Sequence, residues 1–382
     1  MGQGALTMAS IDSQGFSFEN NAIHCTGCYS TNFIFKGNAS TKSRGQVPRY
    51  LCKECGKNFR YGPFVGSKYS ERDICELLDR CARRWSFCEV SEEFGIAKSE
   101  VIRIIEKYTT YLSHYESAWN PKIGLNLELD DMYFQLTDLS IPVKELVPSP
   151  NVDGLRIVRE LEQATHGRTF DEIRNYEITP STATQKVIVE REVTVTNIID
   201  CGNPYFITTE AGRSHKSHSL KSPDDFERLR AALTRATQII GKTQEIRIIT
   251  TDGLLTTYDP AIRLFPIFEH RFQTKEENPA IVNNCESLNR TVRRHVGIWV
   301  RFRTVKSLQI MLEFFRLYYN FIRIHGAILK TPAEGAGYPP LTGNNIEKWF
   351  TTINIGYQYY LKSKIEHAQR IYGRQRLDNR FD

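Results

Sequence analysis

Three acidic residues, far apart along the chain, have the type and surroundings that metal-dependent chemistry needs. Asp252 ends an apolar, β-branched run that begins at Ile246, so its carboxylate stands at the C-terminal edge of a predicted buried strand. Glu286 follows after 33 intervening residues, within a segment of helical period. Asp130 lies on the polar side of a predicted half-buried strand, LNLELDDMYFQL. The three carboxylates therefore belong to three separate elements.

Carboxylate oxygens are the ligands that Mg²⁺ and Mn²⁺ prefer. Two such ions about 4 Å apart can hold the attacking and the leaving oxygen of an in-line phosphoryl displacement. We therefore expect Asp130, Asp252 and Glu286 to bind two Mg²⁺ or Mn²⁺ ions and to be the catalytic residues of a phosphoryl transfer. Asp131 is the alternative to Asp130, because a shift of one residue in strand register exchanges their faces. Asp200 is a further candidate ligand, but an Asp that opens a turn more often binds its own backbone.

The predicted helix that carries Glu286 has an apolar face and a polar face. The apolar positions recur every four residues, at Leu288, Val292 and Val296. Another face holds Glu286, Asn289, Arg290 and Arg293, at i, i+3, i+4 and i+7. One acid and two cations therefore point the same way.

These motifs, in this order, resemble the DDE-type transposases of prokaryotic insertion sequences, whose ribonuclease H-like core is shared with retroviral integrases. The matching pieces are DDMY with Asp130, TTDG with Asp252 and NNCESLNRTVRR with Glu286. YYNFIRIHGAILKTPAEGAG, from 318 to 337, is similar to the closing helix and loop of that core. The resemblance covers roughly 125–337, apart from one insertion, and Met132 stands where the family has Thr.

The resemblance implies an α/β fold whose ribonuclease H-like core is a mixed five-stranded sheet with flanking helices. It implies DNA transposition and recombination by the enzyme of a mobile element. With the metal ions held by Asp130, Asp252 and Glu286, water would cleave the element's end and leave a 3′-hydroxyl, which would then be joined to target DNA. The partners would be double-stranded DNA, as terminal inverted repeats and as target, and a second copy of the chain in a homodimer or higher oligomer. Two other functions stay open, a catalytically inactive transposase-derived DNA-binding regulator and a ribonuclease H-like nuclease.

Two pairs of cysteines near the N-terminus have the spacing of a zinc site. Cys25 and Cys28 form one C-x-x-C pair, and Cys52 and Cys55 form another after 23 intervening residues. Pairs at this separation predict a zinc ribbon in which four thiolates hold a structural Zn²⁺. The alternative is free or disulfide-bonded cysteines, which the paired spacing disfavours. RYLCKECGKNFR also resembles the N-terminal finger of several insertion-sequence transposases.

A segment of helical period from Ser70 to Leu112 follows, with Gly95 where a helix-turn-helix would turn. The recognition helix would run from about Lys98 to Tyr108. Its expected DNA-binding residues are Lys98, Ser99 and Arg103. The alternative is a helical hairpin that only links the ribbon to the core.

The positive charge of the chain is concentrated after the third acid. The net charge is +6, and 283–330 alone holds nine Lys and Arg against two Glu. We expect a strip of arginines there to bind DNA phosphates: Arg290, Arg293, Arg294, Arg301 and Arg303. The alternative is the solvated side of a core helix, and both can hold.

Length and composition complete the expected organisation. The 382 residues divide into a disordered lead at 1–20, a zinc ribbon at 21–64, a helix-turn-helix at 68–118, a catalytic core at 123–340 with an insertion at about 137–185, and a helical tail at 341–382. The insertion includes a predicted helix at 155–164. We find neither an apolar run of about 18 residues nor a secretory leader, so we expect a cytoplasmic, nucleoid-associated protein.

Overall fold

A computed structural model describes residues 23–41, 45–123, 126–142, 176–179, 186–213, 223–241, 246–252, 259, 261–273, 282–297, 302 and 304–378. The chain forms two compact units, Met1–Glu71 with Tyr357–Asp382, and Arg72–Gly356. Within the described residues, no helix is both long and apolar enough to cross a membrane.

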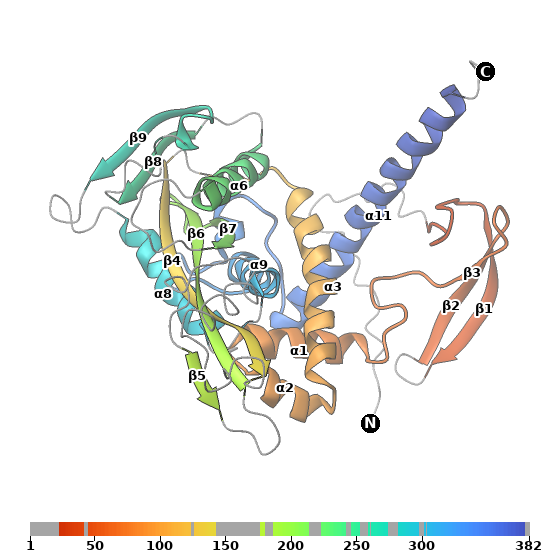
Figure 1. Ribbon diagram of the computed structural model, residues 1–382. Helices are drawn as coiled ribbons and strands as arrows, with labels where there is room; N and C mark the ends of the chain where they lie inside the picture. Colours follow the sequence, from red (N-terminus) through yellow and green to blue (C-terminus); the bar gives the residue numbers. More distant parts are fainter. Residues whose placement is uncertain are drawn as a thin grey trace. The chain divides into compact units, whose positions relative to one another are not determined.

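The elements follow one another along the chain as Figure 1 shows. The first unit contains β1 (Phe33–Thr41), β2 (Gly45–Cys52) and β3 (Asn58–Phe59). The second begins with the helices α1 (Glu71–Ala82), α2 (Phe87–Phe94) and α3 (Lys98–Ser117). Its strands are β4 (Asn126–Pro142), β5 (Tyr176–Thr179), β6 (Lys186–Asp200), β7 (Phe206–Arg213), β8 (Ile246–Asp252) and β9 (Ile267–Gln273). Its later helices are α6 (Pro223–Ile240), α8 (Asn283–Val296), α9 (Val305–Phe321) and α10 (Pro332–Gly335), and α11 (Asn345–Asp378) runs from the second unit into the first.

The first unit is built on a small antiparallel sheet of order β1-β2-β3. Cys25, Cys52 and Phe59 are buried in it, and Phe33 and Tyr50 pack against them. The rings of Phe33 and Tyr50 meet edge to face with centroids 5.2 Å apart. Such a small core holds few apolar side chains, so a metal crosslink would contribute much of its stability.

Capping residues explain where α2 begins and where the turn to α3 starts. Ser86 and Glu89 form a capping box at the start of α2, where each side chain accepts from the other residue's backbone N–H. Gly95 ends the helix at φ 62°, a left-handed conformation that glycine adopts without penalty. The helix predicted to end near Tyr108 continues to Ser117, because Tyr111, Leu112 and Tyr115 extend its buried face.

The second unit contains a mixed sheet flanked by helices, so the α/β class is confirmed. Its order is β5-β6-β4-β8-β9. Strand β7 also pairs with β6, on the same edge as β5 but further along the strand. Strands β4, β6 and β7 are antiparallel, whereas β8 runs parallel to β4 and β9 parallel to β8. The described sheet has six strands instead of the expected five, because the short β5 pairs with the start of β6.

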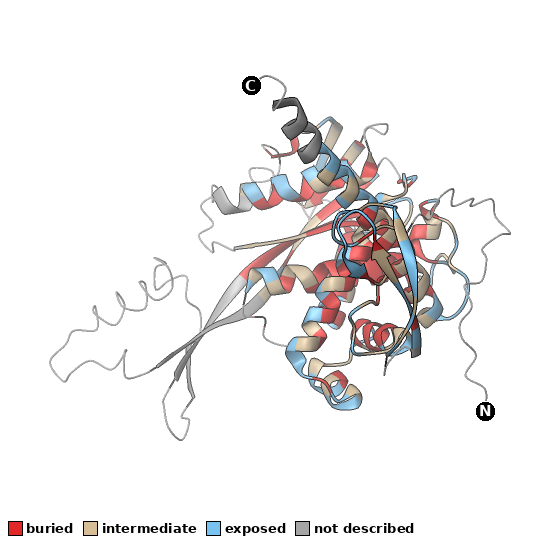
Figure 2. Ribbon diagram, turned by 90° about the vertical axis from the view of Figure 1, so that its right-hand side faces the viewer, coloured by how far each residue is buried: buried red, intermediate tan, exposed pale blue. Residues whose placement is uncertain are grey.

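Helices cover both faces of this sheet and its β7 edge. Alternation along β4 sends Asp130 toward Asn289 of α8 and Asp131 toward Arg228 of α6, so these helices lie on opposite faces. Figure 2 shows the buried residues gathered where sheet and helices meet. Along β7, Gln309 of α9 donates to the Thr209 carbonyl at 2.8 Å and accepts from the Ala211 N–H at 2.7 Å. Asn320 of α9 makes the same pair of bonds with Phe206, so an edge that could recruit another strand is closed.

The strands that flank the predicted insertion are long. Strands β4 and β6 stay paired as far as Pro142 and Lys186, so the insertion predicted at 137–185 begins on the strands themselves. The helix predicted at 155–164 lies outside the described residues.

Candidate functional site

Two of the predicted catalytic acids lie side by side on neighbouring strands. The parallel pairing of β4 with β8 aligns Leu129 with Thr251. Asp130 and Asp252 are the next residues on the two strands, and Asp252 is the last residue of β8. Both carboxylates therefore stand at one level of the sheet, where the parallel pairing ends.

Helix α8 is attached to β4 on both sides of the third acid. The Glu128 carboxylate of β4 accepts from the Cys285 N–H at 2.8 Å and from the Asn284 Nδ2 at 2.7 Å. This buried acid satisfies a backbone N–H in the first turn of α8 that has no partner within the helix, and its charge complements the helix dipole. One turn later, Asn289 Nδ2 donates to Asp130 Oδ2 at 2.8 Å. Glu286 lies between these two contacts.

The Asn289 contact belongs to a buried chain of amides. Asn197 of β6 is the register partner of Asp130, and its Nδ2 donates to Asn289 Oδ1 at 2.7 Å. Because Asn289 accepts there, its own Nδ2 is directed at Asp130. The amides thus fix the orientation of the Asp130 carboxylate.

The pKa of the Asp130 carboxyl responds to its burial and to the charges of the other acids. Burial raises the pKa of its carboxyl to about 7, and the charges of Asp252, Asp131 and Glu286 add to the shift. Carboxylates that repel one another in this way, with oxygen donors only, suit a hard divalent cation, which would reverse the repulsion.

The two alternative acids have structural partners. Asp131 accepts from Thr196 Oγ1 at 2.5 Å and pairs with Arg228 Nη2 at 3.0 Å, on the face opposite α8. Asp200 accepts from the Gly202 N–H at 2.9 Å, which is the turn contact that the sequence favours for it.

The described residues include three of the five arginines in the predicted DNA-binding strip. On α8, Arg290, Arg293 and Arg294 are exposed, whereas Leu288 and Val292 are buried. The helix therefore presents its arginines to solvent and its apolar stripe to the sheet and α9, as the period predicts. Arg301 and Arg303 lie outside the described residues.

The predicted recognition residues begin α3. Lys98 and Ser99 are exposed. Arg103 is exposed as well, but its guanidinium binds both carboxylate oxygens of Glu100, at 2.8 and 2.6 Å. DNA phosphates would have to compete with Glu100 for this side chain.

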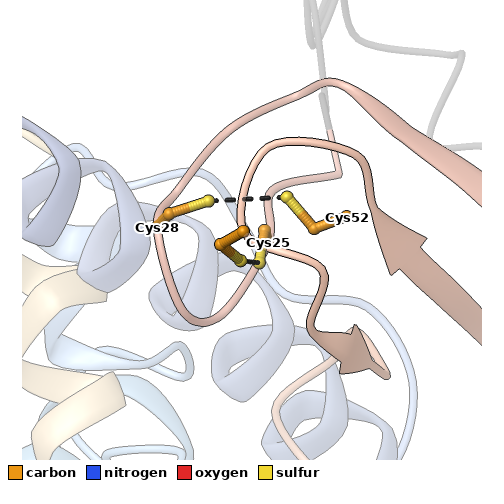
Figure 3. A group of neighbouring side chains, drawn as sticks. Cys25, Cys28 and Cys52 are labelled. Atoms are coloured by element: carbon orange, nitrogen blue, oxygen red, sulfur yellow. Dashed lines mark hydrogen bonds between the residues drawn. The ribbon is translucent and has the colours of Figure 1, made fainter.

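The four paired cysteines form one cluster. Their sulfur atoms all lie within 4.8 Å of one another. The described residues contain no second such group, so the carboxylates of Asp130, Asp252 and Glu286 do not approach one another as closely as these thiols do. Cys25 Sγ lies 3.6 Å from Cys55 Sγ, and Cys28 Sγ lies 3.5 Å from Cys52 Sγ, the contact drawn in Figure 3. A tetrahedral Zn²⁺ with bonds of about 2.3 Å separates its sulfur ligands by about 3.8 Å. The cluster can therefore hold zinc.

The surrounding backbone supports thiolate ligands. The Gly27 N–H donates to Cys25 Sγ at 3.3 Å. A backbone hydrogen bond from Cys55 is the main cause that lowers the pKa of the Cys52 thiol to about 7. Tyr29 at φ 60° and Gly56 at φ 67° make the tight turns that follow the two pairs.

Glu128 was missed by reading the sequence, and so was the role of Asn289. Glu128 alternates with Leu127 and Leu129 and looks like an exposed residue of a half-buried strand. It is buried because α8 covers that face. The available signal was its position two residues before Asp130, on the same face of the strand.

Comparison with known proteins does not assign this chain to a family. No protein-family model matches the chain, and no curated protein sequence matches it. Among solved structures, it resembles the crystal structure of the Mos1 strand transfer complex with 9% sequence identity and a TM-score of 0.24, over 78% of each chain. It resembles a pre-cleavage Mos1 transpososome with 9% identity and a TM-score of 0.25, over 82% of each chain. Scores of this size carry no conclusion about fold or function.

Proposed function

We propose that this chain is a DDE-type transposase with a ribonuclease H-like core, which cleaves DNA at the ends of a mobile element and joins them to target DNA. One observation carries the proposal: Asp130 and Asp252 stand at one level on adjacent strands, and Asn289 ties Asp130 to the helix that carries Glu286. The sheet order supports it, because an antiparallel β4-β6-β7 meander extended by the parallel β8 and β9 is the arrangement expected of such a core.

The three carboxylates would hold Mg²⁺ or Mn²⁺. When bound, these ions supply Lewis acidity and lower the pKa of a water molecule. The chain's own residues do the positioning. Asn289 directs Asp130, Glu128 holds the start of α8, and α8 carries Glu286 to the same edge. Cleavage of a phosphodiester by water leaves a 3′-hydroxyl, which the same carboxylates would present to a second phosphodiester.

Exposed side chains of α8 and α3 would contact the DNA. Arg290, Arg293 and Arg294 are exposed on the helix that carries Glu286, so phosphates bound there would lie near the acids. Lys98 and Ser99, exposed at the start of α3, would contact bases and phosphates in the major groove. Because one site acts on one DNA end, we propose a homodimer or higher oligomer as the active form.

The test is transposition in cells from a donor plasmid that carries the gene between its native flanking sequences. We expect the wild type to move and Glu286→Gln to lose activity completely, because the substitution removes a charged ligand and keeps the side-chain shape. Gel shifts with the flanking duplex should show equal binding by both proteins. Transposition by Glu286→Gln would overturn the assignment of the third acid.

The same experiment separates the other functions. Binding of the flanks by a wild type that never transposes would favour an inactive DNA-binding regulator. Cleavage of an RNA–DNA hybrid in preference to the duplex would favour a ribonuclease H-like nuclease.

A further inference from the structure

The last turn of α1 and the residues that follow it carry three arginines in two different situations. Arg80 pairs with Glu93 at 3.3 Å and lies 4.4 Å from the centre of the Trp85 ring. Arg83 pairs with Asp79 at 2.8 Å. Arg84 is exposed, and no ion pair within the described part of the chain includes it. Arg84 is therefore the cation of this turn that is available to an external anion.

The backbone of Arg84 is in an unfavourable conformation. Its φ is 82°, in the region that glycine adopts readily and residues with a Cβ rarely do. Fold stability alone would favour glycine here. An arginine kept in such a conformation points to a use for its side chain.

A second arginine approaches the same place from the end of α9. Arg323 lies over the Tyr319 ring, 5.5 Å from its centroid. Its Nη1 is buried and has no hydrogen-bond acceptor among the described residues. Because that atom is buried, an external phosphate would bind the other nitrogens of this half-buried guanidinium, for which the described residues supply no carboxylate.

His295 of α8 joins these two arginines. Its Nδ1 donates to the Ala82 carbonyl at 3.0 Å, and its ring lies 4.9 Å from that of Phe315. Burial lowers the pKa of His295 to about 4, and the positive charges of Arg84 and Arg323 lower it further. Contacts place both arginines beside His295. Arg84 follows Ala82 by two residues, and the Arg323 N–H donates to the carbonyl of Tyr318, whose ring centroid lies 6.4 Å from that of His295.

We propose that Arg84 and Arg323 form a binding site for the phosphate backbone of duplex DNA, continuous with Arg293 and Arg294 in the last turn of α8. The site rests on the proposed function, because it takes the same DNA. Among the described residues neither guanidinium has a carboxylate partner, and two such forks match phosphate geometry. Contacts to phosphates carry no base information, so the site sets the position of the duplex and leaves sequence reading to other residues. DNA bound at this site would contact the chain between the pair of helices α2 and α3, which flank Gly95, and α8, which carries Glu286.

The experiment measures duplex affinity by fluorescence anisotropy without divalent cations, so that no cleavage occurs, at several salt concentrations. Two duplexes are used, the native flank and a scrambled sequence of equal length. The variants Arg84→Gln and Arg323→Gln should each lose about 3- to 10-fold in affinity for both duplexes and reduce the salt slope by about 1. Arg84→Lys should retain the slope. Arg83→Gln is the matched control, because it removes the same charge from a paired neighbour, and it should retain wild-type binding.

A glycine variant separates DNA binding from folding. Arg84→Gly relieves the backbone strain, so we expect a higher Tm together with weaker DNA binding. A structural role for the Arg84 side chain predicts a lower Tm instead. Wild-type affinity and salt slope in both Arg84→Gln and Arg323→Gln would overturn the site. A wild type that binds neither duplex would overturn the proposed function as well, so the two failures are distinguishable.

Discussion

At the scale of single residues, Asp130 shows what assembling the acids costs the fold. Burial, together with Asp252, Asp131 and Glu286, raises its pKa from the usual 3.8 to about 7. The folded protein therefore retains a proton that the unfolded chain releases at lower pH. The stability contributed by that proton is complete below about pH 4 and is lost as the pH rises through 7.

Asp130→Asn should remove this pH dependence. Without added divalent cations, the stability of the wild type relative to the variant should fall by about 2–4 kcal/mol between pH 4 and pH 8, because other groups such as His295 titrate in both proteins. The variant should then be the more stable protein at pH 8. Urea unfolding across this pH range measures both curves. A steeper loss in the variant than in the wild type would contradict the cause given for the shift.

The sequence predicts that the adjacent acids Asp130 and Asp131 face opposite sides of the sheet, but it does not predict their partners. Strand alternation predicts that Asp130 and Asp131 face opposite sides, and they do. The sequence does not say that Arg228 would neutralise Asp131, because that contact depends on how α6 docks 97 residues later. For the same reason, the buried position of Glu128 emerges only when α8 covers its face.

At the scale of elements, the sequence predicts the helices and turns that are determined by residues close to one another in the chain. Gly95 ends α2 and the period of Leu288 and Val292 places α8, as predicted. The closure of the β7 edge by Gln309 and Asn320 was not predictable, because it pairs side chains with backbone about 100 residues away. Arg301 and Arg303 remain predictions.

The small sheet of β1, β2 and β3 gives an element-scale prediction about zinc. Cys28→Ser removes one thiolate of the cluster, so the chain should lose its bound zinc and the strands should become sensitive to protease. Metal analysis and limited proteolysis measure these changes. Cys88→Ser is the control, since Cys88 is exposed and outside the cluster. Full zinc content in Cys28→Ser would be incompatible with a four-thiolate site.

At the scale of the whole molecule, a buried ionic network joins the helices of the second unit to its sheet. Arg316 of α9 is fully buried and binds Glu116 of α3 at 2.5 and 2.6 Å and Glu313 at 2.7 and 3.0 Å. Its Nη1 also donates to the carbonyls of Phe206 and Ile207 in β7. The position of α3 relative to the sheet therefore depends on this side chain.

Arg316→Met should destabilise the second unit by about 3–5 kcal/mol, because two buried carboxylates lose their main partner. Arg230→Met is the control, since Arg230 makes an exposed pair with Glu227 at 3.4 Å, and such pairs contribute about 0–1 kcal/mol. Urea unfolding followed by tyrosine and tryptophan fluorescence compares the two. Equal, small losses would show that the network contributes no net stability.

The central claim is that Asp130, Asp252 and Glu286 act together in metal-dependent DNA strand cleavage. The most direct measurement uses purified protein and an end-labelled duplex of the native flank, with Mg²⁺ or Mn²⁺, and tests the product for a 3′-hydroxyl that a polymerase can extend. We predict cleavage by the wild type and by folded Asp131→Asn, and a loss of at least about 1,000-fold in Asp130→Asn, Asp252→Asn and Glu286→Gln. Cleavage that survives in any of these three variants, or that proceeds without a divalent cation, would contradict the account.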